Sequence, residues 1–305
     1  MNEDSLRRLG RSLSNWGRWG SDDQLGTLNL VTPEHVRRAA ALVRRGRAIP
    51  LGIPVAADGP QDGTFRSNPL HLMTDLGSTH RNPGGMHYTD DVIVMGLQST
   101  TQWDALAHIY YDDLFYNGFE RDAVLSEHGA GRLAIDVAVD RMIGRGVLVD
   151  AAGHAGVPWL PAGHAIQPED LDEILDAQGV VVEEGDFLLV RTGWRARFLS
   201  ERTGWMAEEP GLGIRCAAWL HSRGVACVAA DNWAVEAVPS DAGDLVAPLH
   251  MVLIRDLGMM LGELFDLEAL AIDCAADGVY EFLFTAAPLA ITGAVGSPMT
   301  PLAIK

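Results

Sequence analysis

The sequence predicts a single domain in which strands and helices are mixed, the α/β or α+β class. The first observation is a set of short runs rich in Val, Leu and Ile, as expected of strands buried on both faces. The second is a set of helical segments with recognisable ends, and the third is that residues 90–290 contain no linker-like stretch. The predicted strands lie at residues 92–97, 146–150, 186–192, 225–230, 251–255 and 279–285.

Three helices are predicted from their end signals. The first begins at the Thr-Pro pair at 32–33, where Thr can cap and Pro suits the first turn, and should end in a basic turn before Gly46. The others are expected at residues 168–178 and 211–223, the latter stopping at a glycine.

Two further regions are distinguished by composition. Residues 1–31 read as an N-terminal arm whose Trp16 and Trp19 must pack on their own domain or on a neighbouring subunit, which leaves residues 32–305 as the domain itself. Residues 58–91 are rich in Gly, Pro, Asn, Asp and His and are predicted to form a long loop. Loops of this length are usually functional or mobile.

Composition excludes several classes of partner. The 305 residues include 23 Lys and Arg against 41 Asp and Glu, a net charge of −18, which argues against nucleic acid and anionic membranes. The longest apolar stretch, at 245–264, is too interrupted by charge to span a bilayer, and no apolar signal opens the chain. Three scattered cysteines indicate buried thiols rather than disulfides or a zinc ribbon. We therefore expect a cytoplasmic protein that acts on a small molecule.

Residues 97–108, Leu-Gln-Ser-Thr-Thr-Gln-Trp-Asp-Ala-Leu-Ala-His, gather amides, a carboxylate and an imidazole after a predicted strand. Gln98, Gln102, Asp104 and His108 are spaced by 4, 2 and 4 residues. Even spacing puts all four on one face of an extended segment, and a spacing of four also fits one face of a helix. The alternative is that Asp104 caps a turn and His108 is a hydrogen-bonded core histidine.

A second polar cluster lies between residues 231 and 263. An Asp-Asn pair ends a predicted strand at 231–232, His250 precedes the strand expected at 251–255, and Glu263 interrupts an apolar run. A carboxylate in such a run must be paired, bind a metal or face solvent. The alternatives are a surface Glu263 that starts a helix and a His250 that is a satisfied core imidazole.

Both clusters resemble the cyclase-like metal hydrolases, a family that includes bacterial kynurenine formamidases, isatin hydrolases and proteins labelled putative cyclases. The family hallmark is His-x3-His-x-Asp-x3-His, followed later by a His and a Glu about 12 residues apart. Asn-Trp-Gly at 15–17, the run at 22–29 and Thr-Gln-Trp-Asp-Ala-Leu-Ala-His at 101–108 are similar to one branch. The resemblance implies an α/β fold of the swivelling β/β/α type, with a central mixed sheet and flanking helices, assembled as a homodimer or homotetramer.

The resemblance also assigns roles to residues. Asp104 matches the metal-binding carboxylate, His108 the catalytic acid or base, and His250 and Glu263 the second-metal ligands, here 13 residues apart. Gln98 and Gln102 stand where the family has its first two histidine ligands. The implied metal set is therefore Asp104, Gln98, Gln102, His250 and Glu263, and the implied catalytic pair is Asp104 and His108.

The implied reaction is hydrolysis of a small amide, lactam, lactone or formamide by a water activated on Mn²⁺ or Zn²⁺. Amide oxygens are harder and weaker donors than imidazole, so the two glutamines should weaken zinc binding. The site therefore holds a harder ion, such as Mn²⁺, Mg²⁺ or Ca²⁺, or it recruits His71, His80 or His87 from the long loop. Trp103 and His71 are the predicted substrate contacts.

Two alternatives need no metal. In one, Asp104 and His108 act directly as an acid–base pair in a lyase, dehydratase or cyclase, with the glutamines donating to an oxyanion. In the other, the chain is a non-catalytic descendant that binds a small ligand.

Overall fold

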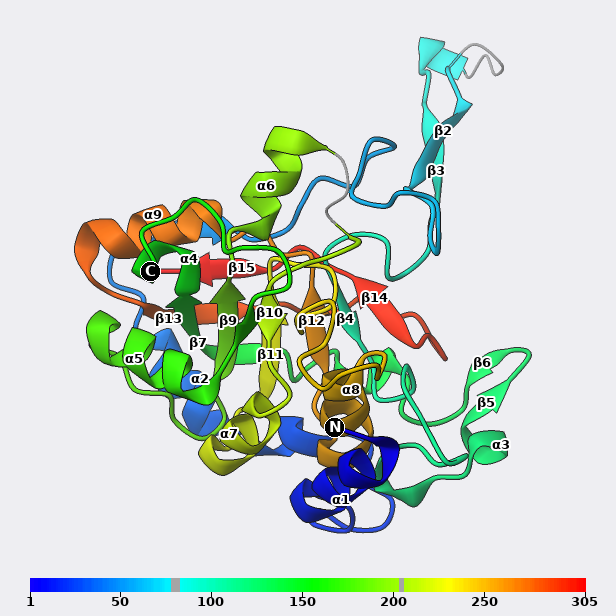
Figure 1. Cartoon of the computed structure of the whole chain (residues 1–305). Coiled ribbons are helices and arrows are strands. Elements are labelled where there is room, and N and C mark those ends of the chain that lie inside the picture. Colours follow the sequence, from blue (N-terminus) through cyan, green and yellow to red (C-terminus); the bar gives the residue numbers. More distant parts are fainter. Residues whose placement is uncertain (78–82, 203–205) are drawn as a thin grey trace.

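The computed structural model describes residues 1–77, 83–202 and 206–305, and its centre is one mixed sheet with helices beside it (Figure 1). Nine strands pair in the order β1-β15-β13-β7-β9-β11-β12-β4-β14. The run β7-β9-β11-β12 is parallel, and the other neighbours pair antiparallel. The α/β class with a central mixed sheet is thus confirmed. In sheet order the bounds are β1 Ala48–Pro50, β15 Leu302–Ile304, β13 Glu281–Thr285, β7 Ile143–Asp150, β9 Phe187–Arg191, β11 Cys227–Ala230, β12 Leu261–Glu263, β4 Gln102–Asp104 and β14 Gly296–Pro298.

The core lies around the middle strands of this sheet. Every residue of β9 and β11 is buried, because both faces of these strands are covered. That is why their sequences are continuous apolar runs without alternation. The strands predicted at 146–150, 186–192, 225–230 and 279–285 are confirmed as β7, β9, β11 and β13.

All three predicted helices exist, but two of them differ from the prediction at one end. One prediction agrees in both bounds, since α5 begins at Pro168 and ends before Gly179, which has a φ of 65°. The helix capped by Thr32 ends at Ala40 rather than at Gly46, and residues 211–212 form a strand ahead of α7. The α-helices are α1 Glu3–Leu13, α2 Pro33–Ala40, α3 Arg121–Val124, α4 Ala151–His154, α5 Pro168–Gln178, α6 Trp194–Glu201, α7 Cys216–Arg223, α8 Pro248–His250 and α9 Glu268–Asp277; the 3-10 helices are η1 Gly26–Leu30, η2 Pro83–Gly85, η3 Tyr116–Gly118 and η4 Ile135–Ala138.

The strand predicted at residues 251–255 is wrong. This segment is a π-helix, η5 (Met251–Leu257), that continues directly from α8. Residues 252–257 are all buried, so the apolar run at 251–254 shows no helical period. A short apolar run of this kind fits a buried strand and a buried helix equally well.

The predicted loop at 58–91 contains an unexpected strand. β2 (Leu70–Asp75) pairs antiparallel with β3 (Asp90–Val94), and the hairpin projects from the body of the molecule (Figure 1). The strand predicted at 92–97 therefore exists in part, but outside the central sheet. Two more short pairs are β8 (Ala165–Ile166) with β10 (Gly211–Leu212), and β5 (Leu125–Ser126) with β6 (Gly129–Ala130).

The N-terminal segment packs on its own chain. Helix α1 lies against η5, and the indole Nε1 of Trp16 donates to the carbonyl of Arg255 at 2.8 Å. The side chain of Asn15 donates to the carbonyl of Leu257 at 3.0 Å. These contacts hold η5, the helix that follows His250. Among the described residues, no helix has the length and apolarity needed to cross a membrane.

Candidate metal centre

Two neighbouring strands position the first part of the site. β4 pairs antiparallel with β12, and the register sets Gln102 directly opposite Glu263. Successive side chains of a strand alternate between its faces, so Asp104 shares the face of Gln102. The amide Nε2 of Gln102 donates to Oε2 of Glu263. Of the two local structures that the spacing allowed, the extended one is present, and it puts the side chains of Gln102 and Asp104 on the same face.

Trp103 takes the opposite face of β4, which corrects its prediction as a substrate contact. Its side chain is fully buried, and its indole Nε1 donates to the carbonyl of Ala286 at 2.8 Å. Gly262 is its partner in β12, and a Cβ at that position would come within 2.7 Å of the indole ring. Trp103 is therefore a core residue that keeps the two strands close.

His250 enters the site from the helical side. Its Nε2 lies 3.1 Å from Oε1 of Glu263, and its Nδ1 lies 2.6 Å from Oε1 of Glu236. Glu236 also accepts the backbone N–H groups of Leu249 and His250, each at 3.0 Å. Burial lowers the pKa of His250, but the hydrogen bonds to Glu236 and Glu263 outweigh it and hold the pKa well above its usual value.

Sequence reasoning missed Glu236. The signal was present, because Glu236 is a single carboxylate in the apolar run at 233–238, the same pattern that singled out Glu263. Its side chain is buried and does not belong to the metal-ligating group; it holds the imidazole of His250 in place. Carboxylates in this position commonly orient histidine ligands of metals.

Three buried side chains form a candidate metal site. One ligand atom each from Asp104, His250 and Glu263 lies within 4.8 Å of the other two. Both carboxylate oxygens of Asp104 and Oε1 of Gln102 are buried and have no hydrogen-bond partner. Burial raises the pKa of Asp104 well above its usual value, and the nearby charge of Glu263 adds to the rise. Unpartnered oxygens in this arrangement fit a divalent cation, which would satisfy them and favour the ionised carboxylate.

His108 stands beside this group and is less buried than its members. Its Nε2 lies 3.7 Å from Oδ2 of Asp104, and its side chain is 21% exposed. Burial, with smaller contributions from the charges of His250 and Arg66, lowers the pKa of His108 to about 4. The imidazole is therefore neutral near pH 7 and has a nitrogen lone pair that can accept a proton.

Gln98 also lies near Asp104, on the side of β4 that pairs with β14. It lies in the turn before β4, and its amide packs on Gly296 of β14, the residue that pairs with Asp104 in the sheet. Its Nε2 is buried without a hydrogen-bond partner. Both glutamines at the family's histidine positions therefore approach Asp104 and keep an unpaired polar atom.

The structure does not bring the described loop histidines to Asp104. His71 is exposed on β2, where its Nε2 lies 2.7 Å from Asp91 of β3, and His87 contacts the carbonyl of Gly77 at 2.6 Å. His80 lies outside the described residues. The predicted roles of His71 as a substrate contact and of His71 or His87 as recruited ligands therefore find no support in the hairpin geometry.

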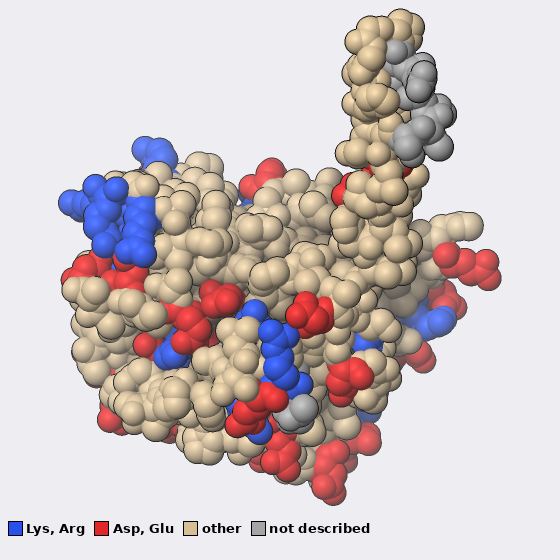
Figure 2. Space-filling view, turned by 90° about the horizontal axis from the view of Figure 1, so that it is seen from above, with Lys and Arg blue, Asp and Glu red and all other residues tan. Residues whose placement is uncertain are grey.

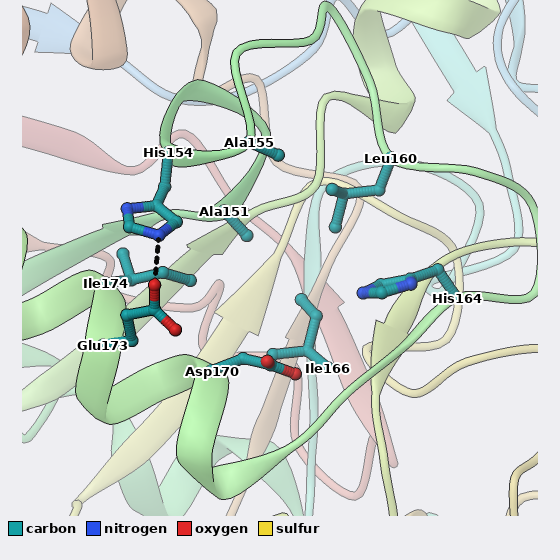
Figure 3. A pocket seen from close by; sticks show the side chains of 9 residues that line it. All are labelled: Ala151, His154, Ala155, Leu160, His164, Ile166, Asp170, Glu173 and Ile174. Carbon is teal, nitrogen blue, oxygen red and sulfur yellow. Dashed lines mark ion pairs between the residues drawn. The ribbon is translucent and has the colours of Figure 1, made fainter.

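A second hollow lies between α4 and α5 (Figure 3). On one side of it Nε2 of His154 lies 3.5 Å from Oε1 of Glu173, and His164 and Asp170 also line the hollow. These four groups are too dispersed to act together on one ion. Within the described part of the chain, Asp104, His250 and Glu263 are the only such group of three.

The chain was compared with known proteins. The family model described as "Putative cyclase" matches residues 29–237. The crystal structure of a novel cyclase is 40% identical, covers 97% of this chain and 99% of its own, and superposes with a TM-score of 0.91. An isatin hydrolase bound to the product analogue thioisatinate is 18% identical over 87% of this chain and 93% of its own, with a TM-score of 0.59.

A predicted metal-dependent hydrolase from Bacillus stearothermophilus is 17% identical over 84% of this chain and 97% of its own, with a TM-score of 0.55. These two more distant structures share the fold. A search of the curated proteins finds no match.

Proposed function

The chain belongs to the Putative cyclase family, and from that premise we propose that it is a hydrolase that depends on a divalent metal ion. Its substrate is a small amide, lactam, lactone or formamide, whose C–N or C–O bond is opened by water. The observation that carries the proposal is the pair of unpartnered oxygens on buried Asp104, beside the donors of His250 and Glu263. A buried carboxylate without a partner is strongly unfavourable, and a cation removes that penalty.

The donor set favours a hard ion. Asp104, Glu263 and the Oε1 of Gln102 supply oxygen, and only His250 supplies nitrogen. Carboxylate and amide oxygens suit Mn²⁺, Mg²⁺ or Ca²⁺, whereas Zn²⁺ prefers imidazole and thiolate. We therefore expect this site to bind Zn²⁺ less strongly than a site with three histidines would. The preference should shift toward Mn²⁺ or Mg²⁺.

A divalent ion bound here would lower the pKa of a coordinated water and polarise the carbonyl of the substrate. Glu236 holds Nδ1 of His250 and would leave Nε2 as the nitrogen that binds an ion. Gln102 holds Glu263 by its amide. The residues on β4 and β12 thus fix the ligand geometry before an ion binds.

His108 moves the proton. Its neutral imidazole accepts the proton of the attacking water as the new C–O bond forms, and donates it to the leaving nitrogen or oxygen as the old bond breaks. The 3.7 Å between its Nε2 and Oδ2 of Asp104 supports a role in proton transfer beside the candidate ligands.

Elemental analysis of the purified protein, before and after chelation and reloading, tests the metal. Asp104→Asn should lose the ion, and His108→Ala should keep it while losing turnover on responsive members of a panel of amides and lactones. Asp91→Asn, on the projecting hairpin, is the matched control and should change neither.

Other results would overturn the proposal. Activity that survives exhaustive chelation would favour the metal-free lyase, dehydratase or cyclase. Thermal shifts with panel compounds but no product would favour a ligand-binding protein. Full turnover by His108→Ala would remove its proton-transfer role.

The expected homodimer or homotetramer has a candidate contact in the hairpin. β2 and β3 expose Leu70, Leu72, Met73, Ile93 and Val94 by 47–60%, and the hairpin carries little charge on the face seen in Figure 2. A two-stranded hairpin by itself is only marginally stable, and an exposed apolar hairpin is typical of a surface that binds another protein. We propose that this surface binds a second copy of the chain. Sedimentation should then show that Leu72→Lys is shifted toward monomer relative to the wild type. The cytoplasmic location stays a prediction.

A further inference from the structure

Arg66 has no anionic partner although it is half-buried. It lies in the segment between β1 and the projecting hairpin, and its Nη1 donates to the backbone carbonyl of Gln98 at 3.0 Å. Its guanidinium lies over the ring of Trp233, 5.4 Å from the centroid. No carboxylate of the described residues forms an ion pair with it. Most of its N–H donors are therefore free.

Apart from Arg18, the other described arginines that stack on aromatic rings pair with carboxylates. Arg223 lies over Trp219 at 4.5 Å and pairs with Asp172 at 2.5 Å, and Arg255 pairs with Asp256 at 2.7 Å. Arg18, which also lacks a carboxylate, is exposed to water. The chain has 41 acidic residues against 23 basic ones, so a half-buried arginine that pairs with no carboxylate is unusual in it. An anion from outside the chain would supply the missing charge.

Arg66 stands beside the metal centre. Its anchor, Gln98, packs on Gly296, which pairs with Asp104 in the sheet. The charge of Arg66 also lowers the pKa of His108, as expected for groups that are near one another. A molecule held by Arg66 would thus lie within reach of the reacting groups.

The surroundings of Arg66 suit a flat molecule with polar edges. The ring of Phe65 lies 6.1 Å from that of Trp233 at a tilt of 30°, so Trp233 is bordered by a second aromatic ring as well as by the guanidinium of Arg66. The indole Nε1 of Trp233 and Nε2 of Gln98 are buried donors without acceptors. Unpaired buried donors are unfavourable, and a ligand oxygen would satisfy them.

We propose that Arg66, Trp233 and Gln98 form a carboxylate subsite beside the metal centre, which selects planar, ring-bearing substrates. The guanidinium can grip a carboxylate by two parallel hydrogen bonds while the ring of the ligand stacks on Trp233. The carboxylate is either a substituent of the substrate or the acid that hydrolysis releases. The role of this subsite in turnover rests on the proposed function, but its binding of a carboxylate does not.

Binding of benzoate and of its neutral isostere benzamide tests the subsite. Both are titrated into the protein as purified and again after chelation, so that direct binding of benzoate to a metal is removed in the second series. Benzoate should bind about tenfold tighter than benzamide in both series, and Arg66→Met should abolish the preference while Arg66→Lys keeps part of it. Arg223→Met is the matched control, because it removes an arginine that stacks on tryptophan but already has a carboxylate.

Equal binding of benzoate by Arg66→Met and the wild type, with both folded by circular dichroism, would overturn the subsite even if the protein proves to be a hydrolase. A preference that follows Arg66 without hydrolysis of any compound would overturn the proposed function and leave the subsite standing. With a turned-over ester or amide, the two sources of carboxylate separate. A raised KM confined to carboxylate-bearing substrates indicates a substituent, and weaker inhibition by the acid product alone indicates the released acid.

Discussion

Glu236→Gln is the sharpest test of the metal centre, because Glu236 itself is not one of the proposed ligands. Oε1 of Glu236 accepts from the backbone N–H and Nδ1 of His250, and Oε2 accepts from the N–H of Leu249. Glutamine has one acceptor oxygen and one donor nitrogen, so at least one of these donors must face an NH₂ group. The side chains of Glu236 and His250 are both buried, so water cannot replace the lost hydrogen bond.

The size of the effect follows from that count. One buried donor left without an acceptor costs about 1–3 kcal/mol of folding stability. Where the lost contact is the one to Nδ1, His250 is also free to rotate, and loss of such an orienting carboxylate lowers metal affinity by about 10–100-fold. We expect both effects, a lower melting temperature and weaker binding of Mn²⁺.

The assay is competition of Mn²⁺ between the protein and a chelating dye, with thermal melts of the metal-free and metal-loaded forms. Glu173→Gln is the matched control, since that carboxylate is 74% exposed and contacts His154 instead. If Glu236→Gln binds Mn²⁺ as tightly as the wild type, His250 is not a ligand held by Glu236. A lower melting temperature with unchanged affinity would leave Glu236 with a structural role only.

Three further predictions concern the scaffold. Lys305, the only lysine, lies 2.8 Å from Asp277 and 3.3 Å from Asp273, so Lys305→Met should lower the free energy of unfolding by about 1–3 kcal/mol in urea titrations. Gly262→Ala would drive a Cβ to within 2.7 Å of the Trp103 ring and should cost about 1–3 kcal/mol, read from the same titrations. Burial raises the pKa of Asp186 from 3.8 to about 7, so the folded state holds a proton that the unfolded state has released. Its contribution to stability is full below about pH 4 and is lost as the pH rises through 7, and Asp186→Asn should flatten that part of the stability profile.

The central sheet was largely predictable from sequence, and the reason is physical. β9 and β11 are buried on both faces, so selection for apolar side chains leaves a continuous run that stands out between turn residues. Segment 251–257 shows the limit of this signal. Its residues 252–254 are equally apolar because they too are buried, and nothing in the composition of so short a run separates a π-helix from a strand. The β2–β3 hairpin was missed for the opposite reason, since both of its faces are exposed and no alternation marks it.

The residues in and around the candidate metal centre differ in how clearly the sequence marks them. Gln102 and Asp104 are two apart on one strand, so a period of two places them together without further information. Glu236 carries the same cue as Glu263 but matches no family position, and it gains its meaning only from contact with His250. Arg66 has no local cue, because its distinction is the lack of a carboxylate neighbour, which only the folded chain can show.

The site is thus built from one rigid half and one half that depends on distant packing. Asp104 and Glu263 belong to adjacent strands of the central sheet, so their separation is fixed by main-chain pairing. His250 ends α8, and the η5 helix that follows it contacts Tyr111 and Leu114 as well as residues 1–31, the latter through Asn15 and Trp16. The N-terminal segment therefore has a role that does not depend on a neighbouring subunit: it helps to hold the helix of His250 against the strands of Asp104 and Glu263. An ion that binds across these two halves would tie the sheet to the helix, so metal binding and the docking of the N-terminal segment should stabilise one another.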